Sequence, residues 1–128
     1  MTVDELVAAA EEARELAYAP YSGFRVGAAL LTGEGRLYTG ANVENASYGL
    51  TVCAERIAVF KAVTSGERNL EIIALTGSGQ GYLYPCGACL QVLAEFAPGL
   101  KVIITDEKRQ LKVYNLNEML PRLFVLPT

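Results

Sequence analysis

The sequence contains no histidine among its 128 residues. This absence excludes catalysis by a Ser-His-Asp or Cys-His arrangement, and it excludes every metal site that needs an imidazole ligand. Few side chains therefore remain that can transfer a proton during a reaction.

Long apolar runs are also missing. The longest ones, such as residues 26–31 and 72–75, are far shorter than the roughly 20 residues that a helix needs to cross a bilayer. The first five residues have no basic stretch followed by an apolar region, so they do not read as a secretory signal. We therefore expect a cytoplasmic protein with no membrane partner.

Basic clusters are missing as well. Eleven Lys and Arg residues stand against 14 Asp and Glu, which gives a formal net charge of -3. A protein that binds long nucleic acids must neutralise many phosphates, so no nucleic-acid partner is expected. With 52% hydrophobic and 20% charged residues the composition is globular, and the length predicts a single domain over residues 1–128.

Helical and extended patterns alternate along the chain. Thr2 and Glu5 fit a capping box ahead of the first helix, Thr51 fits an N-cap, and Asn115 with Glu118 fits a second capping box. The predicted helices cover residues 3–17, 52–65, 85–96 and 116–120, and the predicted strands cover 24–32, 36–43, 70–76, 101–105 and 111–114. We expect a hairpin for the first two strands, parallel pairing across each crossover helix and an antiparallel last strand. This is an α/β domain with a five-stranded mixed sheet.

The three cysteines all lie where a predicted crossover helix begins. We expect Cys53 in the first turn of one helix, and Cys86 and Cys89 in the first turn of the other. Both helix starts lie at the carboxyl edge of a parallel sheet, which is the usual ligand-binding edge. Cys86 and Cys89 are three residues apart and share one helix face. Together the three thiols can fill three tetrahedral positions around a metal and leave the fourth open.

Three protein ligands and one open position are typical of catalytic zinc. Glu55, two residues after Cys53, can act as the general acid and base that histidine does not supply here. Three thiolates around a divalent cation leave a net negative charge, which weakens the metal's ability to acidify water. We expect the two helix N-termini and Arg56 to compensate by drawing charge away from the thiolates.

Other interpretations of the cysteines are available. A single cysteine such as Cys53 is often a small buried core residue. A Cys-x-x-Cys motif such as Cys86 and Cys89 serves either thiol redox chemistry or metal binding. The redox interpretation is weakened because the sequence has no tryptophan and because it gives Glu55 no role. The conjunction of three cysteines, two helix starts and Glu55 favours zinc.

The Cys-Ala-Glu sequence at 53–55 and the Pro-Cys-Gly-Ala-Cys sequence at 85–89 resemble the signature of the zinc-dependent nucleoside and nucleobase deaminases. Within that group the chain is most similar to the small homotetrameric cytidine deaminases. Residues 21–29, 40–48 and 120–124 carry this further resemblance, so that it extends over nearly the whole chain.

The resemblance implies a three-layer α/β/α fold with zinc at the start of two crossover helices. It implies one Zn²⁺ per chain held by Cys53, Cys86 and Cys89, with Glu55 moving protons. The implied reaction is the hydrolysis of cytidine and deoxycytidine to uridine and deoxyuridine plus ammonia, a step of pyrimidine salvage. The implied assembly is a homotetramer whose active sites are shared between subunits.

The resemblance also implies a set of nucleoside contacts. Asn42 and Glu44 would hold the ribose hydroxyls, and Tyr48 and Phe124 would complete the sites of neighbouring subunits. The remaining implied substrate contacts are Phe24 and Ala54, with Phe24 lining the base pocket. Chemistry agrees for the ribose, because an amide and a carboxylate together donate to and accept from vicinal hydroxyls. Ordinary loop bonding for Asn42 and core packing for Phe24 and Phe124 are the alternatives.

One position departs from the family pattern. The family commonly has arginine directly after the last zinc cysteine, where this chain has Leu90. A positive charge near the thiolates is thus missing, and more of the compensation must come from Arg56. Deamination of another aminopyrimidine and a purely structural zinc or redox module remain as alternative functions.

Overall fold

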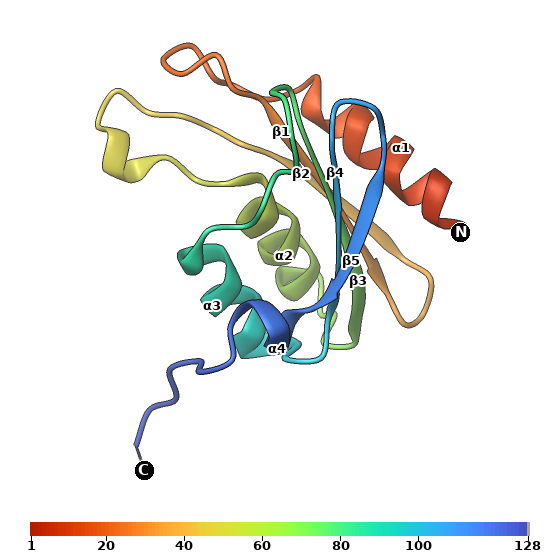
Figure 1. The fold of residues 1–128 in the computed structure, drawn as a ribbon. Helices are drawn as coiled ribbons and strands as arrows, with labels where there is room; N and C mark the ends of the chain where they lie inside the picture. Colours follow the sequence, from red (N-terminus) through yellow and green to blue (C-terminus); the bar gives the residue numbers. More distant parts are fainter. Residues whose placement is uncertain (128) are drawn as a thin grey trace.

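One five-stranded mixed sheet runs through the residues that the computed structural model describes, 1–127, in the strand order β2-β1-β3-β4-β5 (Figure 1). The strands are β1 (Val26–Thr32), β2 (Leu37–Ala41), β3 (Leu70–Gly77), β4 (Lys101–Thr105) and β5 (Leu111–Asn115). The helices are α1 (Val3–Arg14), α2 (Ala54–Thr64), α3 (Gly87–Phe96) and α4 (Leu116–Met119), with one 3-10 turn at Tyr48–Leu50. None of these helices is long and apolar enough to cross a bilayer.

Helix α1 covers one face of the sheet. The predicted capping box is confirmed, because the Thr2 hydroxyl accepts from the Glu5 backbone and the Glu5 carboxylate accepts from the Thr2 backbone. The helix packs Leu6, Val7 and Ala10 against small and branched side chains of the strands. It ends at Arg14, earlier than predicted, because the residues that follow close tighter turns onto the last carbonyls of the helix.

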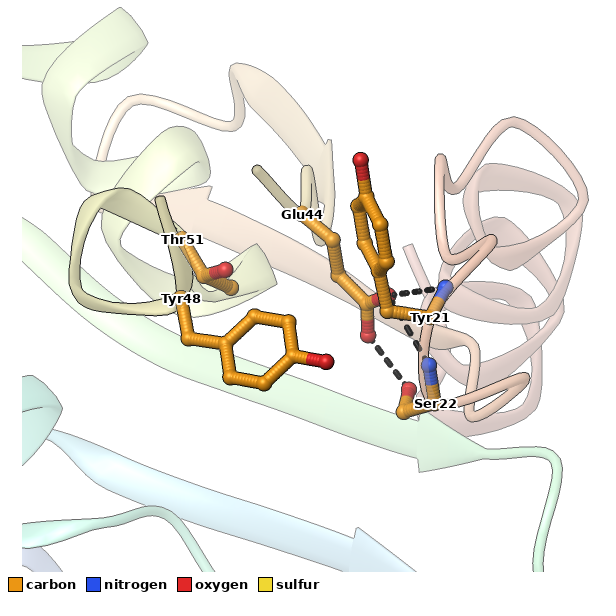
Figure 2. A pocket seen from close by; sticks show the side chains of 5 residues that line it. All are labelled: Tyr21, Ser22, Glu44, Tyr48 and Thr51. Atoms are coloured by element: carbon orange, nitrogen blue, oxygen red, sulfur yellow. Dashed lines mark hydrogen bonds between the residues drawn. The ribbon is translucent and has the colours of Figure 1, made fainter. Parts of the chain in front are cut away.

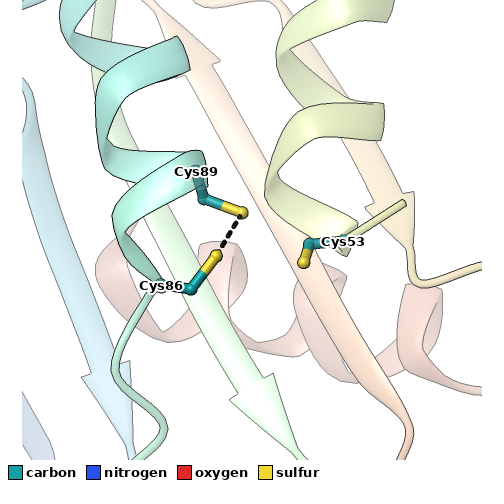
Figure 3. A group of neighbouring side chains, drawn as sticks. All are labelled: Cys53, Cys86 and Cys89. Carbon is teal, nitrogen blue, oxygen red and sulfur yellow. Dashed lines mark hydrogen bonds between the residues drawn. The ribbon is translucent and has the colours of Figure 1, made fainter. Parts of the chain in front are cut away.

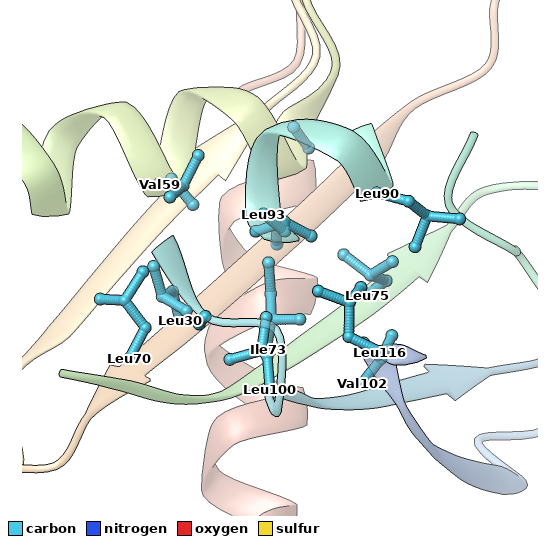
Figure 4. Packing of buried hydrophobic residues seen from close by; sticks show 14 of the residues in the cluster. Leu30, Val59, Leu70, Ile73, Leu75, Leu90, Leu93, Leu100, Val102 and Leu116 are labelled. Carbon is cyan, nitrogen blue, oxygen red and sulfur yellow. The ribbon is translucent and has the colours of Figure 1, made fainter. Parts of the chain in front are cut away.

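Helices α2 and α3 cover the opposite face (Figures 1 and 4). Along the strands, alternate side chains point to opposite faces: Ala74 packs on the α1 side, and its neighbours Ile73 and Leu75 pack under Val59 and Leu93 of the two helices. The predicted three-layer α/β/α fold is therefore confirmed.

One predicted pairing is wrong. We expected β2 and β3 to pair in parallel across α2, but β1 lies between them and is antiparallel to both. The reason is burial: β1 is buried along almost its whole length, so it takes a central position, while β2 lies at the edge. The predicted parallel pairing of β3 with β4 and the antiparallel pairing of β4 with β5 are both confirmed.

The starts of the two crossover helices also differ from the prediction, each by two residues. Cys53 is the N-cap of α2 and Cys86 is the N-cap of α3, so that neither lies in the first turn as expected. Thr51, the predicted cap, instead accepts a hydrogen bond from the Asn45 backbone at 3.3 Å. The N-cap position directs both thiols out of the helix ends and into the space between them.

Candidate active site

The three cysteine thiols meet between the N-termini of α2 and α3 (Figure 3). Their sulfur atoms all lie within 4.8 Å of one another, and the Sγ atoms of Cys86 and Cys89 are 3.5 Å apart. Cys89 is buried, Cys53 is half-buried and Cys86 is exposed. The structure thus brings together the thiols that the sequence placed at two helix starts, and they are not joined by a disulfide.

The spacing of these thiols fits a zinc ion. Tetrahedral zinc with Zn–S bonds of about 2.3 Å separates its sulfur ligands by about 3.8 Å, which is close to the spacing observed here. All three donors are soft sulfur atoms, which select zinc over calcium or magnesium. The residues present therefore fit the metal.

Glu55 lies in the first turn of α2, next to the thiols. Only 4% of this residue is exposed. Burial removes the water that would solvate its charge, so the pKa of Glu55 is raised, and the nearby Cys53 charge raises it further. A carboxylate with a raised pKa next to an open metal position suits a group that must both accept and return a proton.

Arg56 contacts the thiols from the same turn of α2. Its Nη2 atom donates to the Cys53 sulfur at 3.5 Å. The pKa of Cys53 is lowered to about 5, first by a hydrogen bond from Cys89 and also by Arg56, whereas the hydrogen bond to Cys53 and burial raise the pKa of Cys89. Leu90 belongs to α3, and its apolar side chain is buried in the core, so it brings no charge to the sulfurs. Arg56 therefore lies where the prediction needs a cation, within hydrogen-bond distance of the Cys53 sulfur.

We expect Arg56→Gln to weaken zinc binding by about 10- to 100-fold, because neutral glutamine leaves the thiolate charge uncompensated. A competition titration with a chelator measures the affinity. Arg109→Gln is the control, since Arg109 pairs with Glu11 on the surface, far from the thiols in the chain, and should leave zinc binding unchanged. Equal zinc affinity in Arg56→Gln and the unmodified protein would contradict the role of Arg56.

A cavity of about 220 Å³ opens beside the thiols. Most of the predicted site residues of this chain line it, and the full lining is Ser22, Phe24, Val26, Asn42, Glu44, Thr51, Cys53, Ala54, Glu55, Leu83, Tyr84 and Cys86. The Phe24 ring packs closely against Gly79. A Cβ atom added to Gly79 would lie 2.8 Å from the ring. The space therefore has an aromatic wall, a proton-transfer group and a metal-binding group.

Asn42 and Glu44 lie along this cavity, as predicted. The Asn42 side chain accepts from the Val26 backbone at 2.8 Å and donates to the Phe24 carbonyl at 2.9 Å. One amide hydrogen and one lone pair of Asn42 remain for a ligand after these bonds. Asn42 can therefore bond the neighbouring backbone, as the alternative interpretation expected, and still contact a ligand.

The prediction from sequence missed five lining residues, Ser22, Val26, Thr51, Leu83 and Tyr84. The sequence did contain a signal for Ser22, because Ser22 directly precedes a glycine shortly before Phe24. The structure shows that this glycine, Gly23, forms a turn with a φ of 71°. Leu83 and Tyr84 precede Cys86 in a loop, so their approach to the cavity depends on how that loop folds back.

Tyr48 and Phe124 lie outside this cavity. Tyr48 lines an adjacent hollow of about 370 Å³, where its ring meets the Tyr21 ring edge-on at 5.8 Å (Figure 2). Phe124 lies by α3, where the Gln91 side chain bonds its backbone N–H and carbonyl. Tyr48 is 74% exposed and Phe124 is 66% exposed. Neither side chain therefore completes the cavity within its own chain.

Known proteins with this pattern are similar over nearly their whole length. A family model described as the cytidine and deoxycytidylate deaminase zinc-binding region matches residues 1–105. A cytidine deaminase of Sporosarcina psychrophila is 46% identical over 97% of this chain and 92% of that protein. A cytidine deaminase of Halalkalibacterium halodurans is 48% identical over 93% of this chain and 91% of that protein.

Solved structures of cytidine deaminases are also similar to this chain. The crystal structure of cytidine deaminase from Burkholderia pseudomallei has a TM-score of 0.94 and 48% identity, and the match covers 97% of this chain and 100% of that chain. The structure of cytidine deaminase from Mycobacterium tuberculosis has a TM-score of 0.85 and 39% identity over 98% of this chain and 99% of that chain.

Proposed function

Because this chain belongs to the cytidine and deoxycytidylate deaminase family, we propose that it hydrolyses cytidine and deoxycytidine to uridine and deoxyuridine with release of ammonia. The observation that carries the proposal is the buried Glu55 carboxylate beside three convergent thiols, at a cavity that Glu55, Cys53 and Cys86 line. A structural zinc site would need neither the open cavity nor this carboxylate.

Cys53, Cys86 and Cys89, whose sulfur atoms lie within 4.8 Å of one another, would hold the zinc. When bound, zinc supplies a Lewis acid that lowers the pKa of water by several units. Glu55 takes a proton from the attacking water and delivers it to the ring nitrogen next to the reacting carbon. That protonation makes the carbon more electrophilic, and the hydroxide left from the water attacks it to give a tetrahedral carbon. Glu55 then takes the remaining proton of the new hydroxyl and passes it to the amino group, so that the C–N bond breaks, ammonia leaves and the hydroxyl oxygen becomes the carbonyl of uridine.

The other cavity residues bind and orient the nucleoside. Glu44 accepts a hydrogen bond from a ribose hydroxyl, and Asn42 uses its remaining donor and acceptor on the neighbouring hydroxyl. Phe24 and Ala54 enclose the base. The proposal also places the reaction in the cytoplasm, because a reducing compartment keeps three unpaired thiols available for the metal.

Free nucleosides should be accepted as substrates. Phosphorylated nucleosides and cytosine within a polymer should be rejected. The Glu44 carboxylate would repel a phosphate next to the ribose, and the net charge of the chain is -3. An ultraviolet assay of purified protein compares cytidine, cytidine monophosphate and a cytosine-containing oligonucleotide, with bound zinc measured in the same sample. Comparable rates on cytidine and its monophosphate would contradict this selectivity. Bound zinc with no turnover of cytidine would indicate a structural zinc module and refute the proposed reaction.

We further propose a homotetramer in which neighbouring chains complete each active site. Phe124, Val125 and Leu126 are exposed apolar residues at the end of the chain, and Tyr48 is an exposed aromatic residue beside the cavity. Large apolar side chains gathered on a surface favour burial against a partner. A second copy of the chain would cover both groups, and the experiment that tests this is given in the Discussion.

A further inference from the structure

The Glu44 carboxylate is held by the turn that precedes β1 (Figure 2). One of its oxygens, Oε1, accepts the backbone N–H of Tyr21 at 2.9 Å and that of Ser22 at 3.1 Å. The other oxygen, Oε2, accepts the Ser22 hydroxyl. The carboxylate is therefore bound at both oxygens before any ligand arrives.

Ser22 also connects Glu44 to the base pocket. Its oxygen accepts the backbone N–H of Phe24 at 3.0 Å, which fixes the direction in which the hydroxyl donates. The Phe24 carbonyl in turn accepts from Asn42. One chain of hydrogen bonds therefore runs from the aromatic wall of the cavity through Ser22 to Glu44.

The two oxygens of Glu44 differ in what holds them. Oε1 is bound by two backbone groups, which no side-chain substitution removes. Within residues 1–127, Oε2 is bound by the Ser22 hydroxyl alone. Rotation about the last torsion of a glutamate side chain is soft, so loss of this hydroxyl would free the carboxylate to turn. The hydroxyl bond is also the largest cause of the lowered pKa of Glu44.

We propose that Ser22 is a positioning residue, which aims the Glu44 carboxylate at the ribose hydroxyls and thereby sets nucleoside affinity without taking part in the chemical step. This inference rests on the proposed deaminase function. A carboxylate held in advance loses less rotational freedom when the nucleoside binds. Ser22 should therefore act on KM, whereas Glu55 acts on kcat.

The test compares Ser22→Ala with Ser65→Ala. Ser65 is an exposed serine at the end of α2 whose hydroxyl donates to the Lys61 carbonyl, so its variant also loses one hydroxyl hydrogen bond. For cytidine, Ser22→Ala should raise KM about 3- to 10-fold, the scale of one ordinary hydrogen bond, with kcat unchanged within about 2-fold. Ser65→Ala should change neither constant.

A ligand without the 2′ and 3′ hydroxyls separates positioning from a general structural role. 2′,3′-Dideoxycytidine, used as a competitor of cytidine turnover, keeps only its 5′ hydroxyl and so lacks the vicinal hydroxyls that Glu44 is proposed to bind. Its inhibition constant should be the same for Ser22→Ala and the unmodified protein within about 2-fold.

An unchanged KM for cytidine in Ser22→Ala would overturn the inference, and so would equal weakening of cytidine and 2′,3′-dideoxycytidine. Failure of the unmodified protein to deaminate cytidine would instead refute the proposed function.

Discussion

Replacing Glu55 by glutamine is expected to lower kcat for cytidine by about 10²- to 10⁴-fold, the usual contribution of a positioned acid and base. Glutamine has nearly the same shape, so it fits the buried position, but it does not take up and return a proton at neutral pH. The three thiols are untouched, and the variant should keep one zinc per chain. Initial rates followed by ultraviolet absorbance give kcat, and elemental analysis gives the zinc content.

Glu67 provides a matched control, because Glu55 and Glu67 are the two buried carboxylates within residues 1–127. Glu67 is 7% exposed, and Arg36 donates to both of its oxygens at 3.0 and 3.3 Å. Glu67→Gln should lower the melting temperature, because it removes the charge that Arg36 pairs with, and it should leave kcat nearly unchanged. Wild-type turnover in Glu55→Gln with zinc present would refute the proposed proton transfer.

The metal and proton-transfer groups could be predicted because short-range patterns specify them. Cys86 and Cys89 share a helix face as soon as a helix starts there, and Glu55 follows Cys53 within one turn. The predicted starts of α2 and α3 were off by two residues, but Cys53 and Cys86 remained at the helix ends. Local spacing therefore placed Cys89 beside Cys86 and Glu55 beside Cys53, and the expectation that both helices start at one edge of the sheet placed the two pairs together.

Strand order could be predicted only in part. The hairpin and the crossover helices give the direction of each strand, but they do not say which strand lies beside which. β2 and β3 run in the same direction, as expected, yet β1 lies between them. The seven residues of β1 are almost all buried, and that burial depends on layers contributed by distant parts of the chain.

The nucleoside-binding side of the cavity depends even more on distant parts of the chain. Ser22 and Glu44 are 22 residues apart, and their bonds form only because the turn before β1 folds against the segment after β2. Hydrogen-bond partners of this kind leave no spacing pattern in the sequence. Glu44 was identified through the family resemblance, and Ser22 through the structure.

Dissociation of the proposed tetramer is expected to abolish activity even though each chain keeps its own Glu55 and zinc ligands. The end of the chain extends past α3 and α4 instead of folding back over the sheet (Figure 1). Its anchor is Gln91, which fixes the backbone of Phe124 and leaves the ring exposed. Such a ring is placed to enter a neighbouring chain, where a buried aromatic contact contributes strongly to binding.

Sedimentation across a dilution series, measured together with specific activity, tests the shared site. Activity should fall in parallel with the fraction of tetramer. Phe124→Ala should lower kcat/KM at least about tenfold, the scale of a truncated interface aromatic. Val3→Ala is the control, because it also truncates an exposed apolar side chain but lies on α1, on the opposite face of the sheet from α2 and α3. A fully active monomer would refute the shared site, whereas a tetramer with wild-type activity in Phe124→Ala would refute only the role of that ring.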